Sequence, residues 1–150
     1  MSGKYFEDVE TGEKWSSPSR TVTEADITNF AGISGDFHPL HTDEEYAKKT
    51  VFKGRIAHGL LTLAIASGLK TRVEIFGETF MAFLGIEKLR FTAPVRIGDT
   101  IHVETEITDK RETSKEDRGV VTLKSVGKNQ RGEQVYEEFV NIMIKRKPKE

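Results

Sequence analysis

Cysteine is missing from this 150-residue sequence, and its absence excludes several kinds of site. Without thiols the protein can form no disulfide bond, no thiolate nucleophile and no cysteine-ligated zinc site. Long apolar runs are missing too, so no stretch is a candidate membrane span, and the first residues lack the apolar core of a secretory signal. We therefore expect a cytoplasmic protein.

An excess of charge of either sign is also lacking. The formal net charge is −1, which gives no electrostatic case for nucleic acid as a main partner. The sequence does hold 36% hydrophobic and 31% charged residues, a balance typical of a globular protein with a heavily charged surface. The length fits one domain with a substantial core, so we predict a single domain over residues 1–150.

The second half of the sequence has the patterning of β-strands. Residues 101–108 alternate apolar and polar side chains, as a strand with one wet face does. Residues 80–91, 119–126 and 134–145 also read as strands, and the charged stretch 109–118 reads as a solvated hairpin tip. Because the connections are short, we expect the strands to pair antiparallel.

Helices are expected in the first half. A capping box beginning at Thr23 predicts a helix over residues 24–33, and Thr42 as N-cap predicts a short helix over 43–49. The stretch 58–70 is apolar in nearly every direction around a helix, which is typical of a helix buried on all sides. The predicted fold class is therefore α+β, with an antiparallel sheet wrapped around a central buried helix; a plain α+β sandwich has the same layers.

A carboxylate and an imidazole lie close together in the sequence at Asp36 and His41. They are five residues apart, so a regular helix or strand would not align them, but a loop bent by Gly35 and Pro39 could. A neutral imidazole and a carboxylate around one water form a general acid–base pair. The alternative is structural, with Asp36 capping a turn and His41 hydrogen-bonded within the fold.

A second candidate feature is the pair His58-Gly59, where the apolar helix is expected to begin. Amide groups in the first turn of a helix have no intrahelical partner and carry partial positive charge. Gly59 has no side chain, so a ligand oxygen could approach its N–H group closely, as in an oxyanion hole. The alternative is that the glycine only eases the chain into the helix.

Together these stretches resemble the MaoC-like dehydratases and (R)-specific enoyl-CoA hydratases. The stretch Ser34-Gly-Asp-Phe-His-Pro-Leu-His41 is similar to the hydratase motif, and Ala47 matches its following small residue. The stretch Ile56-Ala-His-Gly-Leu-Leu61 resembles the start of the family's central helix. Residues 21–27 and 91–99 resemble the first helix entry and a later strand and turn. The resemblance covers nearly the whole chain and implies the hot-dog fold.

The resemblance also implies a function. The protein is expected to be a hydro-lyase that adds water to a trans-2-enoyl thioester and gives an (R)-3-hydroxyacyl thioester. Asp36 and His41 would be the catalytic pair, and the Gly59 N–H group would bind the thioester oxygen. Substrate-binding or supporting roles fall to Ser34, His38, His58 and Ser67. No metal or other cofactor is implied, and coenzyme A counts as part of the substrate. The expected protein partner is the chain itself, in a homodimer or higher homo-oligomer.

Three alternatives stay open, and His38, which stands where the motif usually has Asn, bears on the first of them. A binding or partner subunit without turnover is the first alternative, and a hot-dog thioesterase is the second. A metal site is the third, since Asp36, His38, His41 and His58 could supply two imidazoles and a carboxylate.

Overall fold

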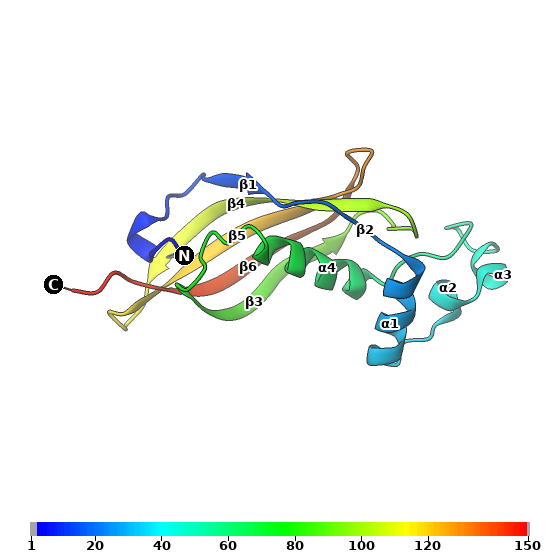
Figure 1. The fold of residues 1–150 in the computed structure, drawn as a ribbon, viewed down its shortest axis with the longest axis horizontal. Helices are drawn as coiled ribbons and strands as arrows, with labels where there is room; N and C mark the ends of the chain where they lie inside the picture. Colours follow the sequence, from blue (N-terminus) through cyan, green and yellow to red (C-terminus); the bar gives the residue numbers. More distant parts are fainter. Residues whose placement is uncertain (1–2, 150) are drawn as a thin grey trace.

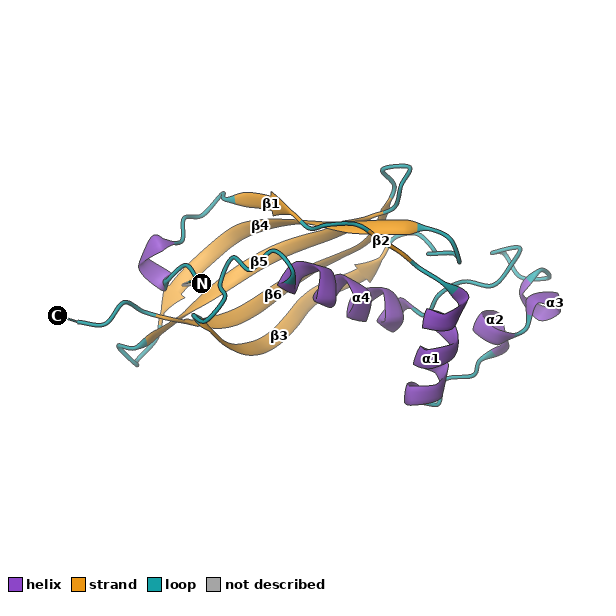
Figure 2. Cartoon of the chain, viewed as in Figure 1, coloured by secondary structure: helices purple, strands orange, loops and turns teal. Residues whose placement is uncertain are grey.

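A computed structural model describes residues 3–149 as an antiparallel sheet with one long helix across its face (Figures 1 and 2). The sheet has the strand order β1-β4-β5-β6-β3, and β2 also pairs with β4. The strands are β1 (Lys14–Ser16), β2 (Arg20–Thr21), β3 (Phe80–Phe91), β4 (Thr100–Glu112), β5 (Arg118–Lys128) and β6 (Gln134–Lys145). A short 3-10 helix, η1 (Phe6–Asp8), precedes β1. The α+β class and antiparallel pairing predicted from the sequence are confirmed.

The charged stretch 109–118 differs from its prediction as a hairpin tip. Strand β4 continues to Glu112 and β5 already begins at Arg118, with Glu112 opposite Gly119 in the register. Backbone pairing extends this far because the charged side chains of the outer strand ends remain in solvent while the N–H and C=O groups pair. Only the residues between these strands form the turn.

Helix α4 (Gly59–Thr71) packs against the inner face of the sheet along one side. Its buried residues are Leu61, Thr62, Ile65, Ala66 and Leu69. Burying a leucine or isoleucine side chain contributes about 1.5–3 kcal/mol, so this face anchors the helix. The opposite side is open: Leu60 is 61% exposed, and Ala64 and Ser67 are exposed as well. The prediction of burial on all sides was therefore wrong for this side.

Three helices gather at one end of the sheet, beside the N-terminal end of α4 (Figure 1). They are α1 (Glu24–Ser34), α2 (Pro39–Thr42) and α3 (Glu44–Ala47). Arg55 holds two of them together, because its guanidinium group donates to Glu24 of α1 at 2.6 Å and to Glu44 of α3 at 2.8 Å. None of the helices within residues 3–149 has the length and hydropathy needed to span a membrane.

The helix starts agree with the sequence at α1 and differ at α3. Thr23 caps α1 in a capping box with Asp26, as predicted. At α3 the N-cap is Asp43, whose carboxylate accepts from the Tyr46 amide at 3.0 Å. Thr42 cannot be the cap because it is the last residue of α2, and its hydroxyl donates instead to the Phe37 carbonyl at 3.1 Å.

Candidate active site

A tight turn carries Asp36 away from the end of α1. Gly35 ends the helix in the left-handed conformation, with φ of 76°, where a residue without Cβ is favoured. The Ser34 hydroxyl donates to the Phe30 carbonyl at 2.6 Å and accepts from the Asp36 amide at 3.1 Å. Asp36 Oδ1 in turn accepts from the His38 amide at 3.1 Å. These bonds fix the carboxylate in place, and Ser34 supports it from the backbone side.

His38 and Pro39 start the short helix α2, which contains His41. The Nδ1 atom of His38 accepts from the Leu40 amide at 3.1 Å and so caps the helix, as an Asn side chain would. Pro39 occupies the first helical position, where its missing N–H group costs nothing. His41 therefore lies inside a helix, whereas the sequence placed it just before one. Helix α2 has only four residues, which are too few to show the periodic apolar pattern that predicts a helix.

The structure brings Asp36, His41 and His58 together. Each offers one potential ligand atom, and all three atoms lie within 4.8 Å of one another. The rings of His41 and His58 stack with centroids 3.9 Å apart and planes 26° from parallel. Asp36 is exposed, His41 is half-buried and His58 is buried, so the cluster leads from solvent into the fold. We refer to these three residues as the Asp–His cluster.

Backbone carbonyls determine which nitrogen of each imidazole carries the proton. His41 Nδ1 lies 2.7 Å from the Ile56 carbonyl oxygen, and His58 Nε2 lies 2.9 Å from the Asp36 carbonyl oxygen. A carbonyl oxygen only accepts, so these two nitrogens are the donors. In the neutral rings the lone pairs are then on His41 Nε2 and His58 Nδ1. The latter is buried and has no hydrogen-bond partner among residues 3–149.

The environment of His41 favours its neutral form. Burial lowers the pKa of His41 below its ordinary value, and the neighbouring His58 and His38 act in the same direction. The hydrogen bond to the Ile56 carbonyl and the Asp36 carboxylate oppose this by raising the pKa. The net lowering leaves an imidazole that can accept a proton at neutral pH.

Two imidazoles and a carboxylate are also typical metal ligands, but their arrangement fits a shared ion poorly. A metal lies in the plane of a coordinating imidazole, about 2.1 Å from the nitrogen. Two rings stacked 3.9 Å apart and only 26° from parallel hold their lone pairs in two separate, nearly parallel planes, and one ion could not lie in both. His38 does not help, because its Nδ1 atom caps α2.

Gly59 is the first residue of α4 and follows directly after His58. His58 is the N-cap residue and makes no capping hydrogen bond through its side chain, so the first-turn amides gain no partner from it. A Cβ atom at Gly59 would lie 2.8 Å from Cε2 of Phe91, so the glycine is also required for close packing of that ring. Both sequence readings of this glycine are therefore compatible with the structure.

A cavity of about 320 Å³ adjoins Gly59. Its lining is mostly apolar: Phe52, Ile56, Ala57, Gly59, Thr62, Phe91, Thr92, Ala93, Pro94, Val95 and Val135. Phe91 was not singled out in the sequence, and the absence of a side chain at Gly59 is the only local sign that a large ring packs there. Ser67 does not join the Asp–His cluster; it lies two helical turns farther along α4 and lines a separate groove.

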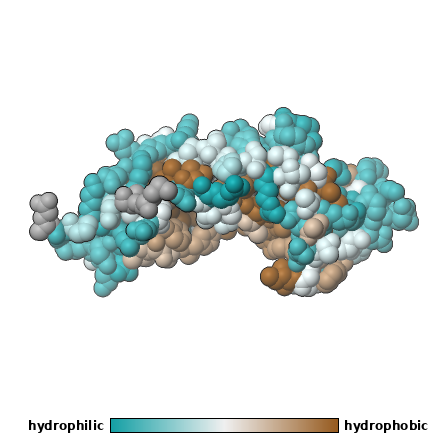
Figure 3. Space-filling view, in the orientation of Figure 1, coloured by the Kyte–Doolittle hydropathy of each residue, from teal (hydrophilic) through white to brown (hydrophobic). Residues whose placement is uncertain are grey.

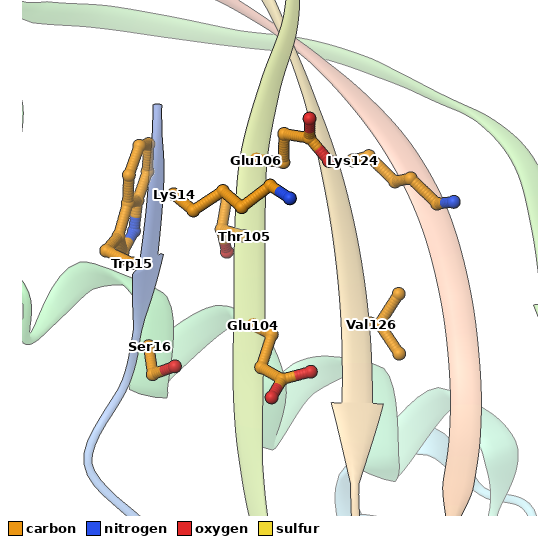
Figure 4. A pocket seen from close by; sticks show the side chains of 8 residues that line it. All are labelled: Lys14, Trp15, Ser16, Glu104, Thr105, Glu106, Lys124 and Val126. Carbon is orange, nitrogen blue, oxygen red and sulfur yellow. The ribbon is translucent and has the colours of Figure 1, made fainter. Parts of the chain in front are cut away.

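Another depression, of about 460 Å³, lies on the outer face of the sheet (Figure 4). Its walls carry charged side chains from three strands, among them Lys14, Glu104, Glu106 and Lys124. Figure 4 shows α4 behind the sheet, so this depression and the helix lie on opposite faces. No member of the Asp–His cluster is among the residues that line it.

Comparison with known proteins identifies the family of this chain. The family described as MaoC like domain matches residues 8–129. The chain is 44% identical over 105 residues to an (R)-specific enoyl-CoA hydratase of Rhodospirillum rubrum, covering 69% of each chain. It is 42% identical over 115 residues to Protein MaoC of Klebsiella aerogenes, covering 77% of this chain and 33% of that longer protein. The chain thus spans about a third of the Klebsiella relative.

Solved structures agree. The X-ray structure of a monoamine oxidase regulatory protein from Archaeoglobus fulgius superimposes with a TM-score of 0.93 at 44% identity, covering 99% of this chain and 98% of that one. A Mycobacterium tuberculosis protein described as a double hotdog fold gives a TM-score of 0.85 at 23% identity, over 99% of this chain and 46% of that one. The second likeness bears on the fold alone, and it agrees with a sheet that wraps around α4. The chain therefore belongs to the MaoC-like dehydratase family and has the hot-dog fold.

Proposed function

We propose that this protein catalyses the reversible addition of water to a trans-2-enoyl thioester, giving an (R)-3-hydroxyacyl thioester. The observation that carries the proposal is the convergence of Asp36, His41 and His58 within 4.8 Å, directly before the first-turn amide of α4 at Gly59. Relatives named (R)-specific enoyl-CoA hydratase and 3-hydroxybutyryl-CoA dehydratase support the reaction class. Their substrate names also support a coenzyme A thioester.

In this mechanism Asp36 and His41 hold the attacking water. The carboxylate and the His41 Nε2 lone pair are both acceptors, and one water has two hydrogens to donate. As the water oxygen bonds to C3 of the enoyl group, one of its protons passes to the pair. We assign the main base role to Asp36, with His41 orienting the water and sharing the proton. C2 then takes a proton from the pair, which restores the starting state.

Gly59 completes the chemistry at the carbonyl end. When the C2–C3 double bond is attacked, negative charge develops on the thioester oxygen. The Gly59 N–H group would donate to that oxygen, at a helix terminus whose partial positive charge adds to the stabilisation. Ser34 and His38 act as positioning residues for the loop. His58 supports His41 through the ring stack, and the mechanism requires no metal or other cofactor.

The proposed assembly is a homodimer in which β3 contributes to the interface. Strand β3 is at one edge of the sheet, and unpaired edges invite pairing with another chain. Its exposed apolar residues are Phe80, Met81, Phe83, Leu84 and Phe91. Figure 3 shows brown, hydrophobic residues along the side of the molecule where β3 lies. Light scattering on the purified protein measures the mass directly and separates a dimer from a single chain.

The decisive experiment follows the loss of enoyl-thioester absorbance when the protein is mixed with crotonyl-CoA. Loss of absorbance with formation of the (R)-3-hydroxy product supports the proposal. Release of free thiol would indicate a thioesterase instead. Thermal stabilisation by the thioester without turnover would indicate a binding subunit. Absence of hydration with crotonyl-CoA, longer enoyl-CoAs and acyl-carrier-protein thioesters would overturn the proposal.

A further inference from the structure

The cap of helix α2 differs in chemistry from the caps of α1 and α3. Thr23 and Asp43 cap α1 and α3 through side-chain oxygens, as most N-cap residues do. At α2 the acceptor is an imidazole nitrogen, because the Leu40 amide donates to His38 Nδ1 at 3.1 Å. Such a nitrogen accepts only while it carries no proton, and histidine is the side chain that ordinarily titrates near neutral pH. The cap of α2 therefore depends on the protonation state of His38.

Leu40 connects this cap to His41. The Leu40 carbonyl accepts from the Ile56 amide at 3.4 Å, and the Ile56 carbonyl accepts from His41 Nδ1 at 2.7 Å. The residue Leu40 is thus held by His38 on its N–H side and by Ile56 on its C=O side. Release of the first bond frees one side of the turn that orients the His41 ring. A displacement of about 1 Å in a positioned group can slow a reaction about a hundredfold.

Helix α2 is a single turn, so each of its hydrogen bonds matters. The His41 amide donates to the His38 carbonyl at 2.9 Å. The Asp43 amide donates to the Pro39 carbonyl, also at 2.9 Å, and the Thr42 hydroxyl donates to the His38 carbonyl at 3.2 Å. One turn gains no cooperative support from further turns, which is where most of the stability of a longer helix accumulates.

Titratable groups from three segments face His38. In the preceding loop, Asp36 Oδ1 accepts from the His38 amide at 3.1 Å, which places a carboxylate beside the residue. In α2 the His41 ring centroid is 6.3 Å from that of His38, and in α3 the Tyr46 ring centroid is 6.0 Å from it. The pKa of His41 is lowered by burial and further by His38, because two positive charges at this separation repel. His38 itself is exposed, so it exchanges protons with solvent.

We infer that His38 is a pH-sensitive positioning residue: while neutral it caps α2 and holds His41 in place, and on protonation it releases the cap. The inference deepens the proposed hydratase function and rests on it for the effect on the rate. Protonation converts Nδ1 from an acceptor into a donor, which then faces the N–H group of Leu40. The ring must turn away, and the Asp36 carboxylate attracts it. An Asn side chain in this place keeps its accepting oxygen throughout the neutral and mildly acidic range.

The test compares the unsubstituted protein with His38→Asn, which replaces a titrating acceptor by one that does not titrate. The matched control is His102→Asn, the same chemical change at a distance from α2. His102 lies on β4 with a side chain that is 28% exposed, and its Nε2 atom is 3.8 Å from Glu104. Circular dichroism establishes that each variant is folded.

The first readout is kcat/KM for crotonyl-CoA as a function of pH, which reports ionisations of the free enzyme. A fall toward acidic pH is common to all three proteins, because Asp36 and His41 must be able to accept a proton. The quantity compared is the ratio of kcat/KM at about pH 7.5 to that at about pH 5.5. We expect this ratio to be at least about threefold smaller in His38→Asn than in the unsubstituted protein, since loss of an N-cap typically shifts a helix equilibrium by about this factor or more. The control should keep the ratio of the unsubstituted protein.

The second readout needs no reaction. NMR spectra over the same pH range follow the ring of His38 and the amide proton of Leu40. We expect the Leu40 signal to move as the His38 ring gains its proton, because the hydrogen bond between them is lost. In His38→Asn the Leu40 signal should stay fixed, and in His102→Asn it should move as in the unsubstituted protein.

The outcomes separate the inference from the hydratase function. If crotonyl-CoA is hydrated and the pH ratio is the same in His38→Asn as in the unsubstituted protein, the inference is wrong and the hydratase function stands. A Leu40 signal that does not respond to protonation of His38 also overturns it, as does a His38 ring that stays neutral down to about pH 5.5. If no thioester is hydrated, the hydratase proposal fails, and the Leu40 signal still decides whether His38 caps α2 only in its neutral form.

Discussion

Replacing Asp36 by Asn separates the proposed base from its structural role. The Asp36 Oδ1 atom accepts from the His38 amide at 3.1 Å, and an Asn oxygen can accept the same bond. The side chain is exposed, and no buried charge is left without a partner by the change. We therefore expect the free energy of unfolding to change by less than about 0.5 kcal/mol.

The chemical consequence should be much larger. An amide cannot take a proton from the attacking water, and a positioned acid–base group typically contributes about 10²–10⁴-fold to the rate. Since each tenfold change corresponds to about 1.4 kcal/mol of activation free energy, the expected loss is about 3–5 kcal/mol. If Asp36 acts on bound substrate, the loss appears in kcat, and KM changes little.

The assay is hydration of crotonyl-CoA, with urea unfolding measured on the same preparations. Asp43→Asn is the matched control, because Asp43 is a nearby N-cap whose carboxylate accepts from the Tyr46 amide at 3.0 Å, and Asn caps helices equally well. Its activity should be unchanged. Retention of activity within a few fold in Asp36→Asn would refute the assignment of the base, and an equal loss in the control would show that the effect comes from the loop.

Three further outcomes test the remaining parts of the site. Folding lowers the pKa of His41, so below about pH 6.5 the folded protein binds fewer protons than the unfolded chain, and the free energy of unfolding should decrease as the pH falls. Urea titrations at about pH 7.5 and 5.5 should show a smaller decrease in His41→Gln than in the unsubstituted protein. His38→Asn should keep the α2 cap and leave the free energy of unfolding unchanged, whereas His38→Ala should lower it by about 1 kcal/mol. Equal free energies of unfolding for the two variants would contradict the capping role. Gly59→Ala places a Cβ 2.8 Å from the Phe91 ring, so we expect the ring to move and kcat/KM for crotonyl-CoA to fall at least about tenfold. Unchanged kinetics would show that substrate binding does not depend on close approach to the Gly59 N–H group.

Periodicity predicted most of the sheet because its long strands each have one face on the core. Strands β3 and β6 begin and end where the sequence placed them, at Phe80–Phe91 and Gln134–Lys145. The charged end of β4 was not predicted, because the backbone pairs with β5 as far as Glu112 whether or not the side chains are apolar. The open side of α4 was missed for a related reason: an apolar side chain such as Leu60 does not reveal whether a neighbour covers it.

The Asp–His cluster was predictable only in its local part. Asp36 lies in the loop after α1 and His41 lies in α2, five residues later, and Gly35 and Pro39 indicated the bend that joins them. The stack of His58 on His41 connects residues seventeen positions apart, and no spacing rule gives such a contact. It depends on how the helices at the end of the sheet pack against the start of α4, which is a tertiary property.

His58 shows why the two halves of the site depend on one another. Its ring stacks on His41 and donates to the Asp36 carbonyl, and its backbone is bonded to Gly59. Any movement of the first turn of α4 therefore moves the ring that supports the acid–base pair and the amide assigned to the thioester oxygen together. Because the face of α4 that packs on the sheet is buried, the sheet fixes this first turn, and the loop carrying Asp36 is positioned against it. In the proposed mechanism, His58 would therefore link the position of the acid–base pair to that of the Gly59 amide, and the buried face of α4 would hold both in place.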